Sequence, residues 1–592
     1  MPDSDDLAAL MDGFHLDNNA PTAYESNEKL IIALDFGTTF SGIAYCFANQ
    51  RDTKVVAIVE WPGAEGESAP KIPTLINYSD AGGGEFAWGA SVNRLQDNIV
   101  GVKLLLDPKQ ERPLYLPTAN AKRAIKSLPK PPVEIAADFI GAVYRHALSE
   151  ISKVVPHDYF KICQKHFVLS VPAVWSDGAK NATLQAAKIA GIFPVTLIKE
   201  PEAAALYTMH SLDFSLNVGD AFVVCDAGGG TVDLISYEVV GLSPTLQVKE
   251  LVPGTGGMAG SLGLNQRFAE AVKNLVGDDQ FADLRKSKGF FLAEKSFDRE
   301  IKRAFKGDQD EEYFVNFPMA YLDDDPELGL EANCWRMTGT DLKAIFAPLI
   351  TDILRLIDDQ VKSVKIKRPG SDVTGIFLVG GFGSSQYLKA CVKREHPDIQ
   401  VLQPTDAWAA IVKGAALSKL PKQATVVATS APKHYGVQAF KIYDPILDKD
   451  VPSQIRRDGS KRALSVRYPF MTWFINMGED IQRNQEIKFS FFRSIDENYS
   501  PNDLIFNDTL YECADQHAPR HQSKGNKIGP NCKLTSDLRS VSSNLFEKRT
   551  DIDGDSYYDV TYNLVVTLKS ALMTFSLEMD GVSMGSVQAK FS

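Results

Sequence analysis

An aspartate, a glycine and two threonines stand at the end of an apolar run near the start of the chain. Residues 30–45 read LIIALDFGTTFSGIAY, which places Asp35, Gly37, Thr38 and Thr39 between two runs of strand-forming residues. A Walker phosphate loop would need a lysine and a following helix, and a dinucleotide-binding turn also leads into a helix. The pattern instead predicts a β-hairpin. Its carboxylate can face the water shell of a metal ion, its hydroxyls and amides can face phosphate, and its glycine lets a ligand approach the backbone.

The same pattern recurs much later in the chain. Residues 222–237 read FVVCDAGGGTVDLISY, with Asp226 at the end of an apolar run and Asp233 in the next one. Between them stand the residues of a second candidate phosphate turn, Gly228, Gly229, Gly230 and Thr231. One such turn is most often an ordinary hairpin, whereas two predict similar lobes that present phosphate-binding turns to a shared cleft.

A third glycine-rich turn has a different shape. Residues 375–396 read GIFLVGGFGSSQYLKACVKREH, which predicts a buried strand, a turn at Gly380 and Gly381, and a helix that begins near Ser384 or Ser385. Small residues at such a turn allow a base or a ribose to lie against the backbone, close to a helix N-terminus. An ordinary strand-to-helix turn of any α/β protein explains this segment equally well.

Together, the three turns resemble the superfamily of sugar kinases, heat-shock chaperones and actin, in which two phosphate motifs and an adenosine motif follow one another in this order. Further segments are similar to the seventy-kilodalton heat-shock (DnaK-type) chaperones, namely residues 167–192, 199–206 (KEPEAAAL) and 297–305 (FDREIKRAF). The resemblance covers about residues 30–420. It is closest to the divergent member-twelve-like branch of heat-shock family A.

The resemblance implies ATP or ADP with Mg²⁺ as the ligand, and it implies a role for each matching residue. Asp35 and Asp226 match carboxylates that hold magnesium through water, and Glu200 matches a carboxylate near the metal and the attacking water. Lys103 is matched to the catalytic lysine of the family, in surroundings that differ from those of the family. The remaining matches form the two phosphate turns and the adenosine site, namely Gly37, Thr38, Thr39, Gly228, Gly229, Gly230, Thr231, Lys302, Arg303, Gly380 and Gly381.

The sequence also departs from the chaperone pattern. The second arginine that faces adenosine in the family is replaced by the run Phe-Gly-Ser-Ser at 382–385. Beyond Pro421 we find no acidic-leucine linker and no helical lid, and short alternating runs predict a small mainly-β domain. Residues 496–544 are polar enough to predict one long mobile loop.

Composition limits the class of protein. A net charge of −12 argues against a nucleic-acid partner, and no apolar run is long enough to predict a membrane span. Seven scattered cysteines indicate reduced thiols, and therefore a cytoplasmic or nuclear protein. The predicted partners are nucleotide and client or co-chaperone proteins.

These patterns predict an α/β chain with a two-lobed, actin-like ATPase (ribonuclease H-like) fold followed by a small mainly-β domain. We expect a disordered leader over residues 1–28, lobe I over 29–215, lobe II over 216–420 and the C-terminal domain over 421–592.

The leading functional hypothesis is a Mg-dependent ATPase of the heat-shock-chaperone type in which hydrolysis is coupled to lobe closure. Two alternatives remain open. One is a weakly hydrolysing nucleotide-dependent scaffold or sensor, and the other is a small-molecule kinase of the same superfold.

Overall fold

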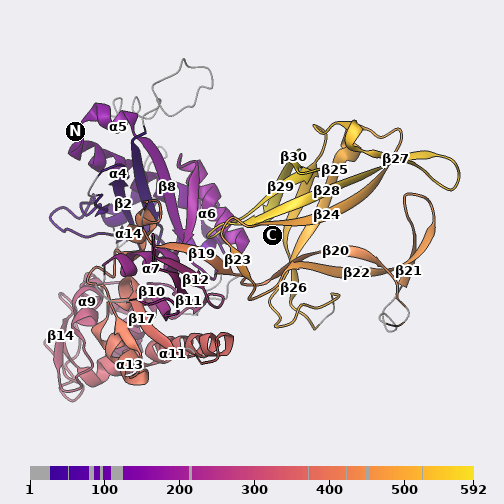
Figure 1. The fold of residues 1–592 in the computed structure, drawn as a ribbon. Coiled ribbons are helices and arrows are strands. Elements are labelled where there is room, and N and C mark those ends of the chain that lie inside the picture. Colours follow the sequence, from indigo (N-terminus) through magenta and orange to yellow (C-terminus); the bar gives the residue numbers. More distant parts are fainter. Residues whose placement is uncertain are drawn as a thin grey trace.

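The computed structural model shows two α/β lobes and a β-rich C-terminal part (Figure 1). It describes residues 27–591 except 51–52, 79–85, 94–95, 97, 108–124, 212–215, 371, 422, 445, 447–452 and 523–524. Most of the predicted disordered leader, residues 1–26, lies outside the described residues. None of the described helices is both long and apolar enough to cross a bilayer.

The first lobe is built on a mixed sheet in the order β3-β2-β1-β8-β9, with β4 also paired to β2. The strands are β1 (Lys29–Asp35), β2 (Phe40–Phe47), β3 (Val56–Ala57), β4 (Ile72–Pro73), β8 (Gln164–Val171) and β9 (Val195–Lys199). One face of β1 packs on helices α4 (Pro132–Val154) and α6 (Asp177–Ile189), because its alternate residues Leu30, Ile32 and Leu34 point to that side.

The second lobe repeats this plan. Its sheet runs in the order β18-β17-β10-β11-β12-β19-β23, with β13 (Thr255–Gly257) also paired to β11. The strands of the main order are β10 (Ala221–Ala227), β11 (Val232–Gly241), β12 (Gln247–Glu250), β17 (Val373–Val379), β18 (Gln400–Leu402), β19 (Thr425–Ser430) and β23 (Asp480–Gln482). The outer face packs on α8 (Leu262–Leu284), α11 (Gly339–Lys367) and α13 (Gln386–Glu395).

Both predicted hairpins are present. Strand β1 pairs antiparallel with β2 and parallel with β8, and β10 pairs antiparallel with β11 and parallel with β17. The aspartate of each turn therefore stands near the end of a buried strand of equivalent position in its lobe.

Helices α7 (Glu200–Ser211) and α14 (Ala410–Leu417) form a layer between the two sheets. Their alanines pack against Ile31 of the first sheet and Phe222 of the second. The two helices approach so closely that a Cβ on Gly414 would lie 1.7 Å from the carbonyl oxygen of Ala203. Because this layer touches both sheets, it fixes how the lobes face one another.

Smaller elements complete the two lobes. Lobe I carries α2 (Val102–Leu105), α5 (His157–Ile162) and the strands β5 (Leu75–Asn77), β6 (Ala87–Trp88) and β7 (Ile99–Val100). Lobe II carries α9 (Lys288–Ser296), α10 (Lys302–Ala304), α12 (Gly380–Gly383) and the strands β14 (Glu312–Asn316), β15 (Leu330–Glu331) and β16 (Cys334–Thr338).

The C-terminal part is a sandwich of two sheets, in the orders β21-β22-β20-β25-β26-β31 and β24-β28-β29-β30, with β27 beside β28. Its core joins Val437 and Leu510 of the first sheet to Tyr562 and Leu577 of the second. The strands are β20 (His434–Ile442), β21 (Ser453–Arg457), β22 (Ala463–Ile475), β24 (Glu486–Asp496), β25 (Ile505–Cys513), β26 (Ile528–Asp537), β27 (Glu547–Thr550), β28 (Ser556–Leu568), β29 (Met573–Met579), β30 (Val582–Ser583) and β31 (Ser586–Phe591).

The prediction of one long loop over residues 496–544 is wrong. The segment contains β25 and β26, which pair antiparallel with each other. Leu510, Cys532 and Leu534 are buried in this pair, while the residues between them are mostly polar. The sequence conceals these strands because polar residues interrupt the apolar ones, as in IFNDTLYEC of β25 and IGPNCKLTSD of β26, so neither strand shows a sustained alternation.

The sandwich is joined to lobe II by strand pairing. Strand β23 lies beyond β20 and β22 in the chain, yet it pairs with β19 and thereby becomes the edge strand of the lobe II sheet. The backbone N–H of Ser430 in β19 also donates to the Glu250 carboxylate at 3.1 Å.

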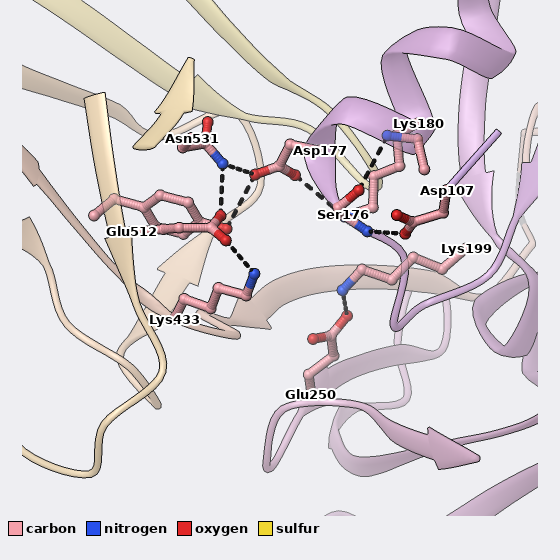
Figure 2. A network of polar contacts seen from close by, with 11 residues as sticks. Asp107, Ser176, Asp177, Lys180, Lys199, Glu250, Lys433, Glu512 and Asn531 are labelled. Carbon is pink, nitrogen blue, oxygen red and sulfur yellow. Dashed lines mark hydrogen bonds and ion pairs between the residues drawn. The ribbon is translucent and has the colours of Figure 1, made fainter. Parts of the chain in front are cut away.

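A polar network joins the sandwich to lobe I (Figure 2). At the start of α6 the Asp177 carboxylate accepts hydrogen bonds from Asn531 Nδ2 at 2.8 Å and from the Tyr435 hydroxyl at 3.2 Å. Lys180 Nζ lies 3.3 Å from the same carboxylate. Burial opposes ionisation of Asp177, but the charge of Lys180 and the donor groups outweigh it and lower the pKa of the carboxyl.

We expect Asp177→Ala to loosen the sandwich from lobe I, because the substitution removes the acceptor of the Tyr435 hydroxyl and leaves Asn531 Nδ2 bonded only to Glu512, within the sandwich. Removing one partner of such a buried network costs about 3 kcal/mol, measurable as a lower thermal unfolding midpoint and faster proteolysis of the C-terminal part. Asp158→Ala is the matched control, since Asp158 also lies in the first turn of a helix, α5, but is exposed. Equal stability of the two variants would contradict the expectation.

Candidate functional site

A cavity of about 740 Å³ opens between the two lobes. Every site residue predicted from the sequence lines it, namely Asp35, Gly37, Thr38, Thr39, Lys103, Glu200, Asp226, Gly228, Gly229, Gly230, Thr231, Lys302, Arg303, Gly380 and Gly381. These residues come from segments far apart in the chain, and the structure brings them together in one cleft.

The two candidate phosphate turns touch across the cleft. A Cβ on Gly229 would lie 2.0 Å from Thr39 Oγ1, and a Cβ on Gly230 would lie 2.9 Å from Thr38 Cγ2. The glycines therefore allow the second turn to approach the threonines of the first. Both turns line the cleft, and glycine-rich turns of this kind bind phosphate in other proteins.

The first turn is braced by the segment that leads into β4. Thr74 Oγ1 donates to the Gly37 carbonyl at 2.9 Å, and the Thr74 N–H donates to the Thr39 carbonyl at 2.7 Å. A Cβ on Gly37 would lie 2.0 Å from the Phe40 carbonyl oxygen. Gly37 is thus required because a side chain would collide with the backbone of the hairpin. The reason predicted from the sequence was instead the close approach of a ligand.

A buried ion pair joins Lys103 of α2 to Glu200, the first residue of α7. Lys103 Nζ lies 2.5 Å from Glu200 Oε1, and both side chains are less than a tenth exposed. Burial raises the pKa of Glu200, the Lys103 charge opposes this, and the result is a pKa of about 7. Glu200 can therefore take up or release a proton near neutral pH.

A second buried ion pair was not predicted from the sequence. Lys71 Nζ donates to Asp35 Oδ2 at 2.6 Å, and Ser170 Oγ donates to Asp35 Oδ1 at 2.8 Å. Burial opposes the charge on Asp35, but Lys71 and Lys103 outweigh it and lower the pKa of that carboxyl. Lys71 is an isolated lysine between two prolines, and no local motif could have indicated its position in the cleft.

Asp226 has no comparable partner. Its side chain is buried, and its Oδ1 atom has no hydrogen-bond partner among the described residues. Burial and the nearby charges of Glu200 and Asp233 raise the pKa of Asp226 well above its ordinary value. Gly380, with φ of +86°, packs so close that a Cβ there would lie 2.4 Å from Asp226 Oδ1.

The charges around the floor of the cleft do not balance. Among the described residues, four buried carboxylates face two buried ammonium groups, and the members are Asp35, Glu200, Asp226 and Asp233 with Lys71 and Lys103. When all six groups are ionised, two negative charges are left over. A divalent cation with a preference for oxygen ligands, such as Mg²⁺, fits this excess and the unpartnered oxygen of Asp226.

The far end of the cleft carries basic and aromatic groups. The Arg303 guanidinium lies 5.3 Å from the Trp408 ring, and Trp408 meets the edge of Phe40 at 5.5 Å. Lys302 Nζ donates to Asn265 at 2.7 Å. Trp408 was not singled out by the sequence analysis, and it lies beside Gly381, where a Cβ would be 3.7 Å from the indole. This end can hold a flat ring between cationic and aromatic surfaces.

Comparison with known proteins places most of this cleft in one family. Residues 131–420 match the family model described as "Hsp70 protein". The match includes Glu200, the second turn and the basic and glycine pairs at the far end. Asp35, Lys71 and Lys103 precede it.

Two relatives extend the similarity beyond that match. Over 79% of its length the chain is 26% identical to the "Heat shock 70 kDa protein 12A" of Mus musculus, of which 81% is covered. It is 23% identical to the "Heat shock 70 kDa protein 12B" of Homo sapiens over 78% of each chain. The predicted resemblance to the member-twelve-like branch and the predicted actin-like ATPase fold are confirmed.

The pKa of Glu200 predicts how stability depends on pH without ligand. A folded pKa of about 7 lies above the ordinary value of 4.5, so the folded chain binds this proton more tightly and gains stability as pH falls from 8 to 6. The share of Glu200 is about 1 kcal/mol, or about 1 °C in the unfolding midpoint of a chain of 592 residues.

Melting curves at pH 6 and pH 8 in EDTA should show this difference, and Glu200→Gln should reduce it. Glu395→Gln, at an exposed position at the end of α13, is the control. An unchanged pH difference in Glu200→Gln would contradict the assigned pKa.

Proposed function

We propose that the chain binds Mg-ATP between its lobes and hydrolyses it slowly, on the premise that residues 131–420 match the Hsp70 family model. The observation that carries the proposal is the pair of glycine turns facing each other over a buried, unpartnered Asp226. The cleft buries two more carboxyl groups than ammonium groups, and glycine-rich turns line it on both sides, which suits a metal–polyphosphate complex.

The proposed roles follow from the position of each group. Asp35 and Asp226 hold the waters of the cation, and the amides of Gly229 and Gly230 hold phosphate oxygens with the hydroxyls of Thr38, Thr39 and Thr231. The Gly228 amide instead closes the turn, because it donates to the Thr231 carbonyl at 2.9 Å. Bound Mg²⁺ would neutralise charge that develops on the phosphate oxygens. Glu200 orients the attacking water and can accept its proton, since its pKa is about 7, while Lys103 keeps the carboxylate in place.

The adenosine end is proposed to lie against Gly380 and Gly381, beside Lys302 and Arg303. The second arginine of the family pattern is missing from 382–385, and the Trp408 ring stands over Arg303 instead. A purine can therefore stack here through aromatic and cationic contacts.

We also propose that lobe closure acts on the C-terminal sandwich through α7. Glu200 of this helix faces the cleft, and Glu202, two residues later, accepts hydrogen bonds from Arg483 at 2.7 Å and Ser570 at 2.5 Å. Arg483 directly follows β23, and Ser570 lies between β28 and β29. Because Glu202 is fully buried, a shift of α7 must carry the sandwich with it or break these bonds.

The proposed domains are lobe I (29–215), lobe II (216–420) and the C-terminal domain (421–592), the last being where client or co-chaperone proteins would bind. We propose the cytoplasm or the nucleus as its location, because all seven cysteines are free and reducing compartments keep thiols in that state.

A nucleotide-dependent scaffold is the second candidate function. The observations that favour it are two contacts that cross the cleft, namely Phe40 with Trp408 and Arg299 with Glu67 at 2.8 Å. A cleft held closed in this way would release product slowly, and closure itself would then be the signal.

Mg-ATP should stabilise the chain against heat. At a ligand concentration a hundred times its dissociation constant, linkage contributes about 2.7 kcal/mol, and Asp226→Asn should lose most of this gain because it removes the carboxylate that faces the cation. Thermal unfolding with Mg-ATP, with ATP in EDTA and without ligand measures the effect. No shift at millimolar Mg-ATP would refute nucleotide binding.

Thr231→Ala should slow hydrolysis more than it weakens binding, because the hydroxyl is proposed to hold the phosphate that is transferred. Losing one positioned group of this kind costs about 10²–10³ in rate. Single-turnover hydrolysis and nucleotide titration measure the two effects separately, with Thr351→Ala on the exposed side of α11 as the control. A Thr231→Ala rate equal to that of the parent would show that the site is wrongly assigned. A parent without turnover would favour the scaffold.

A further inference from the structure

Lys71 is a buried charged side chain of the cleft to which the proposed function gives no task. Its ammonium group reaches the cavity from the segment that braces the first phosphate turn, and its side chain is 7% exposed. A lysine is rarely buried to this extent without a specific partner or task.

The backbone around Lys71 is held firmly. Ile72 and Pro73 form β4, which pairs with β2, and Thr74 bonds to both Gly37 and Thr39. Gly42 of β2 makes room for the lysine, because a Cβ there would lie 3.0 Å from Lys71 Cγ and 2.5 Å from the Pro70 carbonyl oxygen. These contacts fix the backbone and the first side-chain carbons of Lys71. Rotation about the outer bonds of the side chain can still move the ammonium group between partners within the cleft.

Lys71 forms its ion pair with Asp35, which is also one of the carboxylates proposed to bind the water molecules around the cation. Lys71 Nζ lies 2.6 Å from Asp35 Oδ2, a position that an ammonium group and a hydrated dication cannot share, because like charges at such distances repel strongly in a buried site. When Asp35 turns to the cation, Lys71 needs another acceptor. The Asp226 carboxyl is also near Lys71, but in the proposed complex it holds waters of the same cation. The acceptors left for Lys71 are then the phosphates proposed to lie between the glycine turns.

Lys103 is less suited to that task. It is held by Glu200 at 2.5 Å, and its ammonium group lies 5.4 Å from the Trp175 ring. Glu200 is not proposed to hold the cation, so nothing in the cleft competes with Lys103 for its partner.

We propose that Lys71 binds the phosphates of the nucleotide directly, and that it pairs with Asp35 when no nucleotide is bound. The inference rests on the proposed function, and it names the residue that recognises the polyphosphate chain. In this proposal Lys71 and Asp35 form an ion pair with each other until nucleotide and cation bind. Lys71 then contacts phosphate, and Asp35 contacts the waters of the cation.

Titration in EDTA isolates this role, because Asp35 then has no cation to hold. Asp35→Asn should bind ATP more tightly than the parent, since it frees Lys71 and removes a negative charge. Lys71→Met should bind ATP about tenfold to a hundredfold more weakly, the value of one charge-assisted hydrogen bond. Adenosine, which has no phosphate, should bind the parent and both variants equally.

The double variant Asp35→Asn/Lys71→Met decides between a ligand and a structural partner. It removes one charge of each sign, so it preserves the charge balance of the cleft and avoids an unpaired buried carboxylate. We expect it to bind ATP far more weakly than Asp35→Asn alone and adenosine as well as the parent does.

If the double variant binds ATP as tightly as Asp35→Asn, Lys71 only neutralises Asp35 and the inference is overturned. If the parent binds adenosine but the single Lys71→Met change leaves its ATP affinity intact, the inference also fails while the nucleotide site stands. If the parent binds neither ATP nor adenosine under any condition, the proposed function fails and takes the inference with it. Lys103→Met serves as the control, since it should slow hydrolysis without removing the phosphate contact.

Discussion

The cleft is organised by the cost of burying more negative than positive charge between two lobes. Asp35, Glu200, Asp226 and Asp233 are all taken from water, and two lysines balance only part of their charge. The unbalanced part appears as the raised pKa of Asp226 and of Glu200. Such an arrangement is costly for the folded chain alone, and the proposed cation and polyphosphate would relieve that cost, which would link stability to ligand binding through the same groups.

The layer formed by α7 and α14 connects the cleft to both sheets and to the C-terminal sandwich. It packs against both sheets, and the absence of a side chain at Gly414 lets the two helices pack with their backbones in close contact at Ala203. The same α7 carries Glu200 into the cleft and Glu202 into the C-terminal sandwich. Densely packed layers move as rigid units, so a change at the cleft has a mechanical route to the sandwich.

The sandwich is attached at three places of different chemistry. Strand β23 extends the lobe II sheet through backbone pairing, the Asp177 network holds lobe I through buried polar groups, and Glu202 holds Arg483. Backbone pairing tolerates many side chains, whereas the two polar contacts need complementary partners. Because backbone pairing needs no particular side chains, the attachment of the C-terminal part to lobe II leaves no recognisable motif in the sequence.

The sequence by itself determined the two hairpin turns, the adenosine turn and the α/β plan, because each is a local pattern of an apolar run followed by small and polar residues. It could not determine Lys71 or Trp408, since each is a single residue whose neighbours form no motif and whose role arises from segments distant in the chain. It also misjudged β25 and β26, in which polar residues interrupt the apolar ones. Only the tertiary structure decided which residues share the cleft, because burial and pairing of charges depend on contacts between segments and not on the order of residues along the chain.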